Sequence, residues 1–353
     1  MLRGSVAALV VVAVAALAAS AAGSRHAGPW PSGEVVMGTL TKPPTAAFLA
    51  RVRGGEMGGV LLLGRWPSAR VVARATAALQ RAACVRGEPL LVAVDQEGGV
   101  VRRFAWAAPS VAPAEIDDPV VARQQAAAAA DALRAVGVDV DFAPVVDTPG
   151  GARSFLGSRA FSRSAAANAT LGAAFVDGLQ SAGAAATAKH FPGLGEAGAN
   201  TDDKAVVVRA AKWKLMRGLV PFRKAVDAGV KLVMVGSAAY PALDPSGLPA
   251  VFSKAIETDL LRGELGFDGV AVTDALDAPA AARVPHAATK AIAAGADLLV
   301  FGSERDGEQA FATLAADARK YPRLRARLAE SGQRIRELKD WLAAQGGPSC
   351  SGA

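Results

Sequence analysis

The chain has 353 residues, of which 52% are hydrophobic and 20% charged, and its formal net charge is +7. This composition excludes an intrinsically disordered protein and a small domain held together mainly by disulfides. The excess of basic residues is modest for this length and aromatic residues make up only 5%, so we expect no nucleic acid among the binding partners.

The N-terminus has the pattern of a secretory signal peptide. Arg3 precedes an apolar stretch over residues 6–22, and Ala19-Ser20-Ala21 fits the small-residue rule for cleavage. We therefore expect residues 1–24 to be a signal peptide, and the protein to be secreted or to lie in the cell envelope without stable membrane insertion. A retained anchor helix is the alternative, because the apolar stretch is close to the shortest that spans a bilayer.

From residue 34 onward, short aliphatic segments alternate with alanine-rich helical patterns. Several segments are continuously apolar, which is typical of parallel strands buried on both faces. The expected strands are residues 35–40, 59–63, 90–95, 138–143, 185–190, 231–237, 269–274 and 298–301. Between them, spacings such as that of Leu171, Phe175 and Leu179 place apolar side chains on one helix face.

Eight strand–helix units predict an α/β fold, a single-domain (β/α)8 TIM-type barrel over residues 25–345 with a flexible tail at 346–353. A doubly wound open sheet is the alternative, but its G-x-G-x-x-G turn is absent and Gly98-Gly99 does not match it. The two cysteines, Cys84 and Cys350, are either disulfide-bonded, which export permits, or free thiols.

Polar residues follow several of the expected strands, at the end of a barrel where active sites form. They are Asp95-Gln96-Glu97, Asp147 and Arg159, Lys189-His190, Ser237 with Tyr240, and Thr273-Asp274. His190 is the only one of three histidines at a strand end, which makes a zinc site improbable, so we expect no metal and no cofactor. No G-x-S-x-G motif is present. The remaining carboxylates and cations suit binding of sugar hydroxyls and attack on an acetal carbon.

Seven stretches of the sequence resemble glycoside hydrolase family 3, in the single-domain form typified by bacterial β-N-acetylhexosaminidases. They are VAVDQEGGVVRR (92–103), VGVDVDFAPVVDT (136–148), GSRAFS (157–162), AKHFPGLG (188–195), VMVGSAAYPALDP (233–245), LLRGELGFDGVAVTDALD (260–277) and AAGADLLV (293–300). The resemblance implies a barrel and a retaining mechanism through a covalent glycosyl-aspartate. It implies that Asp274 is the nucleophile, that Asp95 binds sugar hydroxyls, and that Arg159, Lys189 and His190 are further substrate-binding residues.

The loop after KHFPG departs from the family pattern. That pattern continues with G-H-G and then Asp-Ser-His, whose histidine is the general acid/base. Here residues 193–203 read GLGEAGANTDD, with Leu194 at the first histidine and Asn200-Thr201-Asp202 in place of Asp-Ser-His. Val100 also replaces the arginine that usually follows DQEGG, and Arg102 or Arg103 is a candidate to compensate.

Three interpretations of the altered loop remain open. In the first, Asp202 is the acid/base, with Asp203 or Glu196 as substitutes, because a carboxylic acid is the ordinary solution in glycosidases. In the second, another group supplies the proton, for example from another chain. In the third, the site binds sugar without turning it over.

We therefore expect a secreted retaining β-glycosidase that resembles β-N-acetylhexosaminidases and acts on terminal β-linked sugars, for example in cell-wall fragments. The alternatives are β-glucosidase or β-xylosidase specificity, and a non-catalytic carbohydrate-binding protein of the envelope. The partner in each case is a carbohydrate, and the sequence does not fix the oligomeric state.

Overall fold

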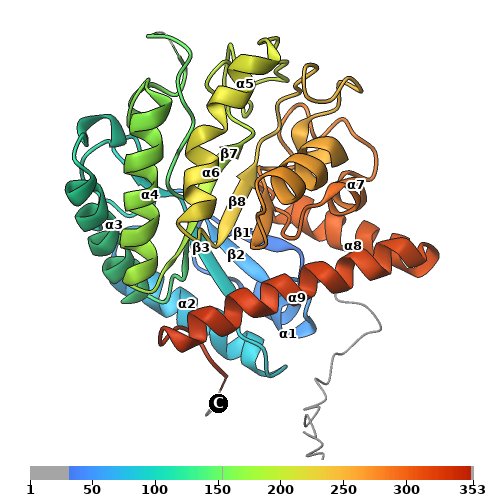
Figure 1. Cartoon of the computed structure of the whole chain (residues 1–353). Helices are drawn as coiled ribbons and strands as arrows, with labels where there is room; N and C mark the ends of the chain where they lie inside the picture. Colours follow the sequence, from blue (N-terminus) through green and yellow to red (C-terminus); the bar gives the residue numbers. More distant parts are fainter. Residues whose placement is uncertain (1–31, 153, 351–353) are drawn as a thin grey trace, which may run out of the picture.

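The computed structural model describes residues 32–152 and 154–350 (Figure 1), and the expected signal peptide lies outside this part of the chain. Seven strands form one parallel sheet in the order β1-β2-β3-β6-β7-β8-β9. They are β1 (Met37–Leu40), β2 (Gly59–Leu62), β3 (Leu91–Val94), β6 (Val140–Asp141), β7 (Ala185–Phe191), β8 (Leu232–Val235) and β9 (Val270–Thr273). The first seven expected strands are therefore confirmed, with bounds that differ by a few residues.

The expected eighth strand, residues 298–301, forms isolated bridges instead of a ladder. Leu298 bridges to Val272 in β9, and Leu299 bridges to Val36 just before β1, both in parallel. Met37 donates its amide hydrogen to the carbonyl of Leu299 at 2.9 Å. The prediction of an α/β fold with a parallel sheet is confirmed, as a curled sheet of seven strands whose two edges both contact this segment.

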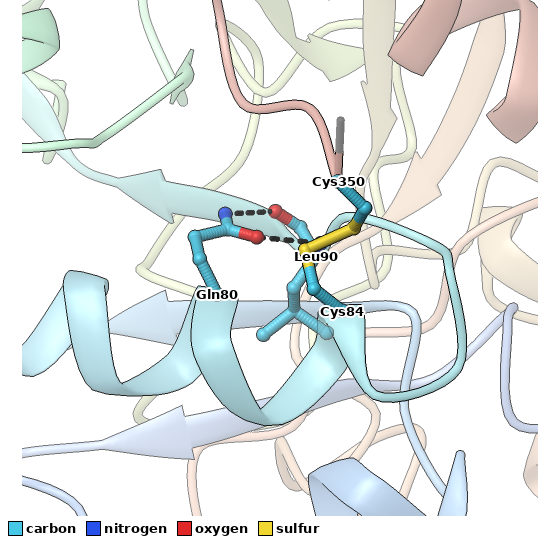
Figure 2. Close-up of a disulfide and its surroundings, with 4 residues drawn as sticks. All are labelled: Gln80, Cys84, Leu90 and Cys350. Atoms are coloured by element: carbon cyan, nitrogen blue, oxygen red, sulfur yellow. Dashed lines mark hydrogen bonds between the residues drawn. A yellow bond between two sulfur atoms is a disulfide. The ribbon is translucent and has the colours of Figure 1, made fainter. Parts of the chain in front are cut away.

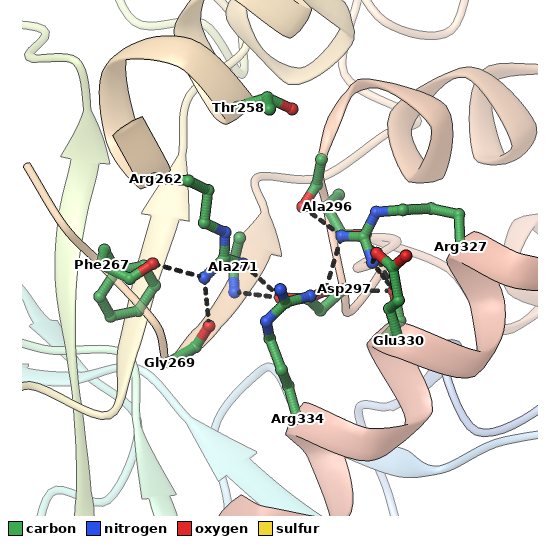
Figure 3. Close-up of polar contacts among 12 residues, drawn as sticks. Thr258, Arg262, Phe267, Gly269, Ala271, Ala296, Asp297, Arg327, Glu330 and Arg334 are labelled. Carbon is green, nitrogen blue, oxygen red and sulfur yellow. Dashed lines mark hydrogen bonds and ion pairs between the residues drawn. The ribbon is translucent and has the colours of Figure 1, made fainter. Parts of the chain in front are cut away.

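An ion cluster holds the start of this segment. The carboxylate of Asp297 is buried and accepts hydrogen bonds from three guanidinium groups (Figure 3), which belong to Arg262, Arg327 and Arg334. It also accepts a hydrogen bond from the amide of Ala271 in β9 at 3.0 Å. Because Arg327 and Arg334 lie on the last helix, the cluster ties that helix to the sheet.

The helices lie outside the sheet, as the alanine-rich patterns predict. They are α1 (Ala46–Gly54), α2 (Ala69–Cys84), α3 (Pro119–Arg134), α4 (Ala165–Ser181), α5 (Lys212–Gly218), α6 (Val220–Asp227), the π-helix Ala255–Glu264, α7 (Ala287–Ala294), α8 (Glu304–Lys320) and α9 (Pro322–Ala344). Short 3-10 turns occupy Pro113–Glu115, Gly157–Arg159 and Ala250–Phe252. Figure 1 shows α3, α4 and α6 side by side and the long α9 running across the lower part of the molecule. No helix in the described ranges combines the length and apolar character of a membrane span.

Strand β3 illustrates why the strands are apolar on both faces. Leu91 and Ala93 belong to the main core, whereas Val92 and Val94 pack in a second apolar cluster with residues of α2. Successive side chains of a strand point to opposite faces, so a strand covered on both sides favours apolar residues at consecutive positions. The charged residues of the site lie instead at the carboxyl ends of the strands and in the loops.

The two cysteines form a disulfide. Figure 2 shows the bond between Cys84, the last residue of α2, and Cys350 near the C-terminus. Next to it, the side-chain amide of Gln80 donates to the carbonyl of Leu90 at 2.7 Å and accepts from its backbone amide at 3.0 Å. Of the two alternatives that the sequence leaves open, the structure has the disulfide.

Candidate active site

A cavity of about 860 Å³ opens beyond the carboxyl ends of the strands. It is lined by all six residues to which the sequence gives a role: Asp95, Arg159, Lys189, His190, Asp202 and Asp274. These residues come from β7, from the positions directly after β3 and β9, from the 3-10 turn Gly157–Arg159 and from the loop after β7. In a parallel sheet the carboxyl ends of neighbouring strands meet at one edge, which brings together residues distant in sequence.

A buried ion cluster forms one wall of the cavity. The ammonium group of Lys189 lies 2.8 Å from Asp95 Oδ1 and 2.7 Å from Glu97 Oε1. Glu97 also accepts two hydrogen bonds from the guanidinium of Arg159, each 2.8 Å long. Burial by itself raises the pKa of Glu97, but the charges of Lys189 and Arg159 outweigh it and lower this pKa to about 2. Glu97 is therefore an anion that orients two cations toward the cavity.

The turn after β3 fixes the position of Glu97. It is an antiparallel hairpin of β4 (Gln96–Gly98) and β5 (Val101–Arg102). Gly98 has a φ of 97°, and a Cβ there would lie 2.4 Å from the carbonyl oxygen of Val111, so the hairpin requires glycine. Glu97 is one of the strand-end polar residues, but the sequence does not predict its role, because its partners Arg159 and Lys189 are far away along the chain.

The same hairpin carries the two arginines that are candidates to compensate for Val100. Arg103 lines the cavity, and its guanidinium lies 3.7 Å from Asp95 Oδ2. Arg102 instead donates to the carbonyl of Ala105. Val100 is 78% exposed. Of the two candidates, Arg103 is therefore the one that contributes a charge to the cavity.

His190 is held by a buried carboxylate. Asp147 accepts hydrogen bonds from the amide of His190 at 3.0 Å and from the amide of Leu194 at 2.6 Å, and it lies 2.8 Å from His190 Nδ1. A proton on Nδ1 satisfies this contact, which leaves Nε2 as the ring nitrogen available to a ligand. Leu194 packs in the hydrophobic core. The position at which the family has a histidine therefore faces the protein interior here.

Asp274 follows β9, and its Oδ1 accepts a hydrogen bond from the amide of Ala275 at 2.9 Å. Burial raises the pKa of Asp274 above its usual value, the positive charge of His190 lowers it, and the negative charge of Asp202 raises it further. Asp274 and Asp202 line the same cavity. Asp202 is exposed, and its Oδ2 accepts a hydrogen bond from the side-chain amide of Asn200 at 3.2 Å.

The structure separates the three acids that the sequence offers as proton donors. Asp202 and Asp203 line the cavity, whereas Glu196 lines a neighbouring one. Within the described residues, no group of three or more His, Cys, Asp or Glu side chains is arranged to hold a metal ion. The cations of the cavity can donate hydrogen bonds to sugar oxygens, and two carboxylates, Asp202 and Asp274, line the same cavity. Such groups suit binding and cleavage of a glycoside.

Comparisons with known proteins agree with this chemistry. The family model described as the glycosyl hydrolase family 3 N-terminal domain matches residues 33–338. A β-hexosaminidase of Nitrosomonas eutropha is 37% identical over 265 residues, which cover 71% of this chain and 75% of that protein.

Two solved structures resemble the whole fold. A family 3 β-N-acetylglucosaminidase from Paenibacillus sp. str. FPU-7 has a TM-score of 0.84 and 32% identity, with 90% of this chain and 63% of that chain covered. The chain thus spans less than two thirds of that protein. A β-N-acetylhexosaminidase from Beutenbergia cavernae has a TM-score of 0.79 and 32% identity, with 90% of this chain and 97% of that chain covered.

Proposed function

Because this chain belongs to glycosyl hydrolase family 3 and is an O-glycosyl hydrolase, we propose that it is a retaining β-N-acetylhexosaminidase. The observation that carries the proposal is that Asp274 and Asp202 line one cavity together with the cluster of Asp95, Lys189 and Arg159. A retaining glycosidase needs one carboxylate to attack the anomeric carbon and a second group to move protons.

In the proposed mechanism Asp274 is the nucleophile. Its carboxylate forms a bond to the anomeric carbon while the bond to the leaving oxygen breaks, and a proton passes from Asp202 to that oxygen. In the second half Asp202 takes a proton from water, whose oxygen then displaces Asp274 from the anomeric carbon. The positive charges of His190 and Lys189 support the ionised form of Asp274 against the effect of burial.

Asp202 is the proposed proton donor because it lies in the active-site cavity and its charge acts on Asp274. Asp203 lines the same cavity and is the substitute. Glu196 faces another cavity, which makes it the least suitable of the three. A donor from another chain, and a site that binds sugar without turnover, are outcomes of the experiment below.

The substrate contacts follow from the ion cluster. Asp95 accepts hydrogen bonds from sugar hydroxyls, while Lys189, Arg159 and His190 donate to sugar oxygens. The preference for N-acetylhexosaminides over glucosides or xylosides rests on the names of the relatives. We further propose that residues 298–301 close the sheet as an eighth strand, and that the protein is exported through residues 1–24 to act on cell-wall glycans.

The test is hydrolysis of aryl β-glycosides of N-acetylglucosamine, glucose and xylose by the wild type, Asp274→Asn and Asp202→Ala. The proposal expects turnover of the N-acetylglucosaminide, with loss in both variants, and mass labelling of Asp274 by a slow fluorinated glycoside. Turnover only of another sugar corrects the specificity, and activity that survives Asp202→Ala moves the proton donor to Asp203 or elsewhere. A folded protein that hydrolyses no glycoside is a binding protein.

A further inference from the structure

A second cavity of about 250 Å³ lies beside the active-site cavity. We call it the rim cavity and define it by five side chains, Arg163, Glu196, Trp213, Lys214 and Arg217. Trp213, Lys214 and Arg217 belong to α5, and Arg163 lies just before α4. Three cations and one carboxylate leave this rim positively charged, and none of these side chains has a role in the proposed hydrolysis.

One wall of the rim cavity is rigid. The amide of Gly150 donates to the carbonyl of Gly195 at 2.8 Å, which ties the loop after β6 to the loop after β7. A Cβ at Gly195 would lie 1.7 Å from the carbonyl oxygen of Thr148, so the loops pack too closely for any other residue. The hydroxyl of Tyr240 also donates to the carbonyl of Gly193 at 3.0 Å. The wall is therefore formed before a ligand arrives.

The side chains around this wall offer two kinds of contact. Trp213 is 63% exposed, which leaves an indole face open to solvent, and Lys214 Nζ lies 5.8 Å from the ring centre. Lys214 Nζ also lies 3.8 Å from the Glu196 carboxylate. In the described part of the chain, no hydrogen bond or ion pair engages the guanidinium of Arg163 or of Arg217. An open aromatic face thus stands beside two cations without partners.

We propose that the rim cavity binds a sugar unit that carries an anionic group, as a second glycan site beside the active-site cavity. The apolar face of a sugar ring stacks on the indole of Trp213, and a carboxylate or phosphate accepts hydrogen bonds from Arg163 and Arg217. The volume is below the usual range of about 300–1,000 Å³ for small-molecule pockets, which suits a single ring. The carbohydrate nature of the ligand rests on the proposed function.

The rim cavity is connected to the active site through the loop after β7. Residues 192, 193, 195 and 196 of this loop line the rim cavity, while residues 200, 202 and 203 line the active-site cavity. A ligand in the rim cavity therefore contacts the segment that carries Asp202. It also competes with Glu196 for Lys214, because both are anionic.

The experiment follows the NMR resonance of the Trp213 indole N–H in the full chain. The chain carries Asp274→Asn so that the sugar probes are not hydrolysed. The resonance is assigned by its loss in Trp213→Phe. The probes are a tetrasaccharide of alternating N-acetylglucosamine and glucuronate, N-acetylglucosamine 6-phosphate, and neutral chitotetraose. We expect the acidic probes to shift the resonance and chitotetraose to shift it far more weakly. The acidic probe that shifts it at the lower concentration shows whether carboxylate or phosphate is the preferred anion.

Two variants complete the test. Arg163→Ala/Arg217→Ala should weaken the acidic probe about tenfold, whereas Arg319→Ala/Lys320→Ala on α8 should leave its affinity unchanged. An unmoved indole resonance with all probes, equal shifts with chitotetraose, or equal losses in both double variants would overturn the proposal. Hydrolysis of a small aryl glycoside, measured separately in the wild type and Trp213→Phe, should be the same. If the proposed function is wrong, the wild type does not hydrolyse the aryl glycoside, and this result does not depend on whether the probes bind to the rim cavity.

Discussion

The carboxylate of Glu97 accepts two hydrogen bonds of 2.8 Å from the guanidinium of Arg159, although the two residues are 62 positions apart in the sequence. The same carboxylate lies 2.7 Å from the ammonium group of Lys189. Glu97 and Lys189 are each only 2% exposed. Two proposed substrate-binding cations therefore take their orientation from one buried anion, which also lines the active-site cavity.

Glu97→Gln should lower both stability and catalytic efficiency. The substitution keeps the shape of the side chain but removes the buried negative charge that Arg159 and Lys189 share, which costs about 3–5 kcal/mol of unfolding free energy. Urea denaturation and kcat/KM for an aryl glycoside measure the two effects. The control is Glu56→Gln, because Glu56 pairs with Arg51 at 2.8 Å but is partly exposed, and its loss should cost less than about 1 kcal/mol. Similar losses in both variants would contradict the prediction.

Asp202→Ala should slow hydrolysis most for substrates with poor leaving groups. Protonation of the leaving oxygen matters when that oxygen is basic and matters little when it is already a stable anion. We expect a loss of about 100-fold or more for chitobiose and a much smaller loss for a dinitrophenyl glycoside. Asp203→Ala is the matched control from the same cavity. An equal loss on both substrates would mean that Asp202 does not donate the proton.

Asp139→Asn should make the protein more stable at alkaline pH. Asp139 is buried and accepts a hydrogen bond from the amide of Val92 at 3.3 Å, and burial raises its pKa from 3.8 to about 8. Between these values the folded state holds a proton that the unfolded state has released, so this group makes stability fall as the pH rises from about 4 to about 8. Asparagine has no ionisable side chain, so the variant does not lose stability through this group as the pH rises.

The measurement is the difference in unfolding free energy between Asp139→Asn and the wild type at several pH values. This difference should grow by more than about 1 kcal/mol between pH 5 and pH 8 in favour of the variant. Asp268→Asn, at an exposed position, should give a difference that stays constant with pH. A constant difference for Asp139→Asn as well would show that Asp139 is not protonated in the folded protein.

Cys84→Ser/Cys350→Ser should lower the unfolding free energy by about 2–4 kcal/mol, because the disulfide restricts the unfolded chain. Hydrolysis should be unaffected, since Cys84 precedes β3 whereas Asp95 follows it at the opposite end of the strand. Thermal unfolding and aryl-glycoside kinetics check the two statements. Alkylation under denaturing conditions should add two groups per chain only after reduction. Two groups without reduction would show that the bond is not formed.

The pattern of apolar segments predicted seven of the strands within a few residues, and with them the strand ends at which Asp95, Lys189 and Asp274 lie. Burial on both faces favours apolar residues at most strand positions, and this preference can be read from neighbouring residues. The eighth expected strand has the same local pattern but forms only isolated bridges. Whether a segment forms a full ladder depends on both of its neighbours in the sheet, which lie far from it in sequence.

The sequence by itself therefore determined the α/β class, the order of the strands along the chain and the residues that meet at their carboxyl ends, because each of these follows from local periodicity. Only the tertiary structure decided that Glu97 joins Arg159 to Lys189, that Asp147 holds His190, and that Glu196 faces a different cavity from Asp202. These contacts depend on how loops fold back over the sheet. That arrangement is set by packing between segments distant in sequence, so no local periodic pattern predicts which residues make contact.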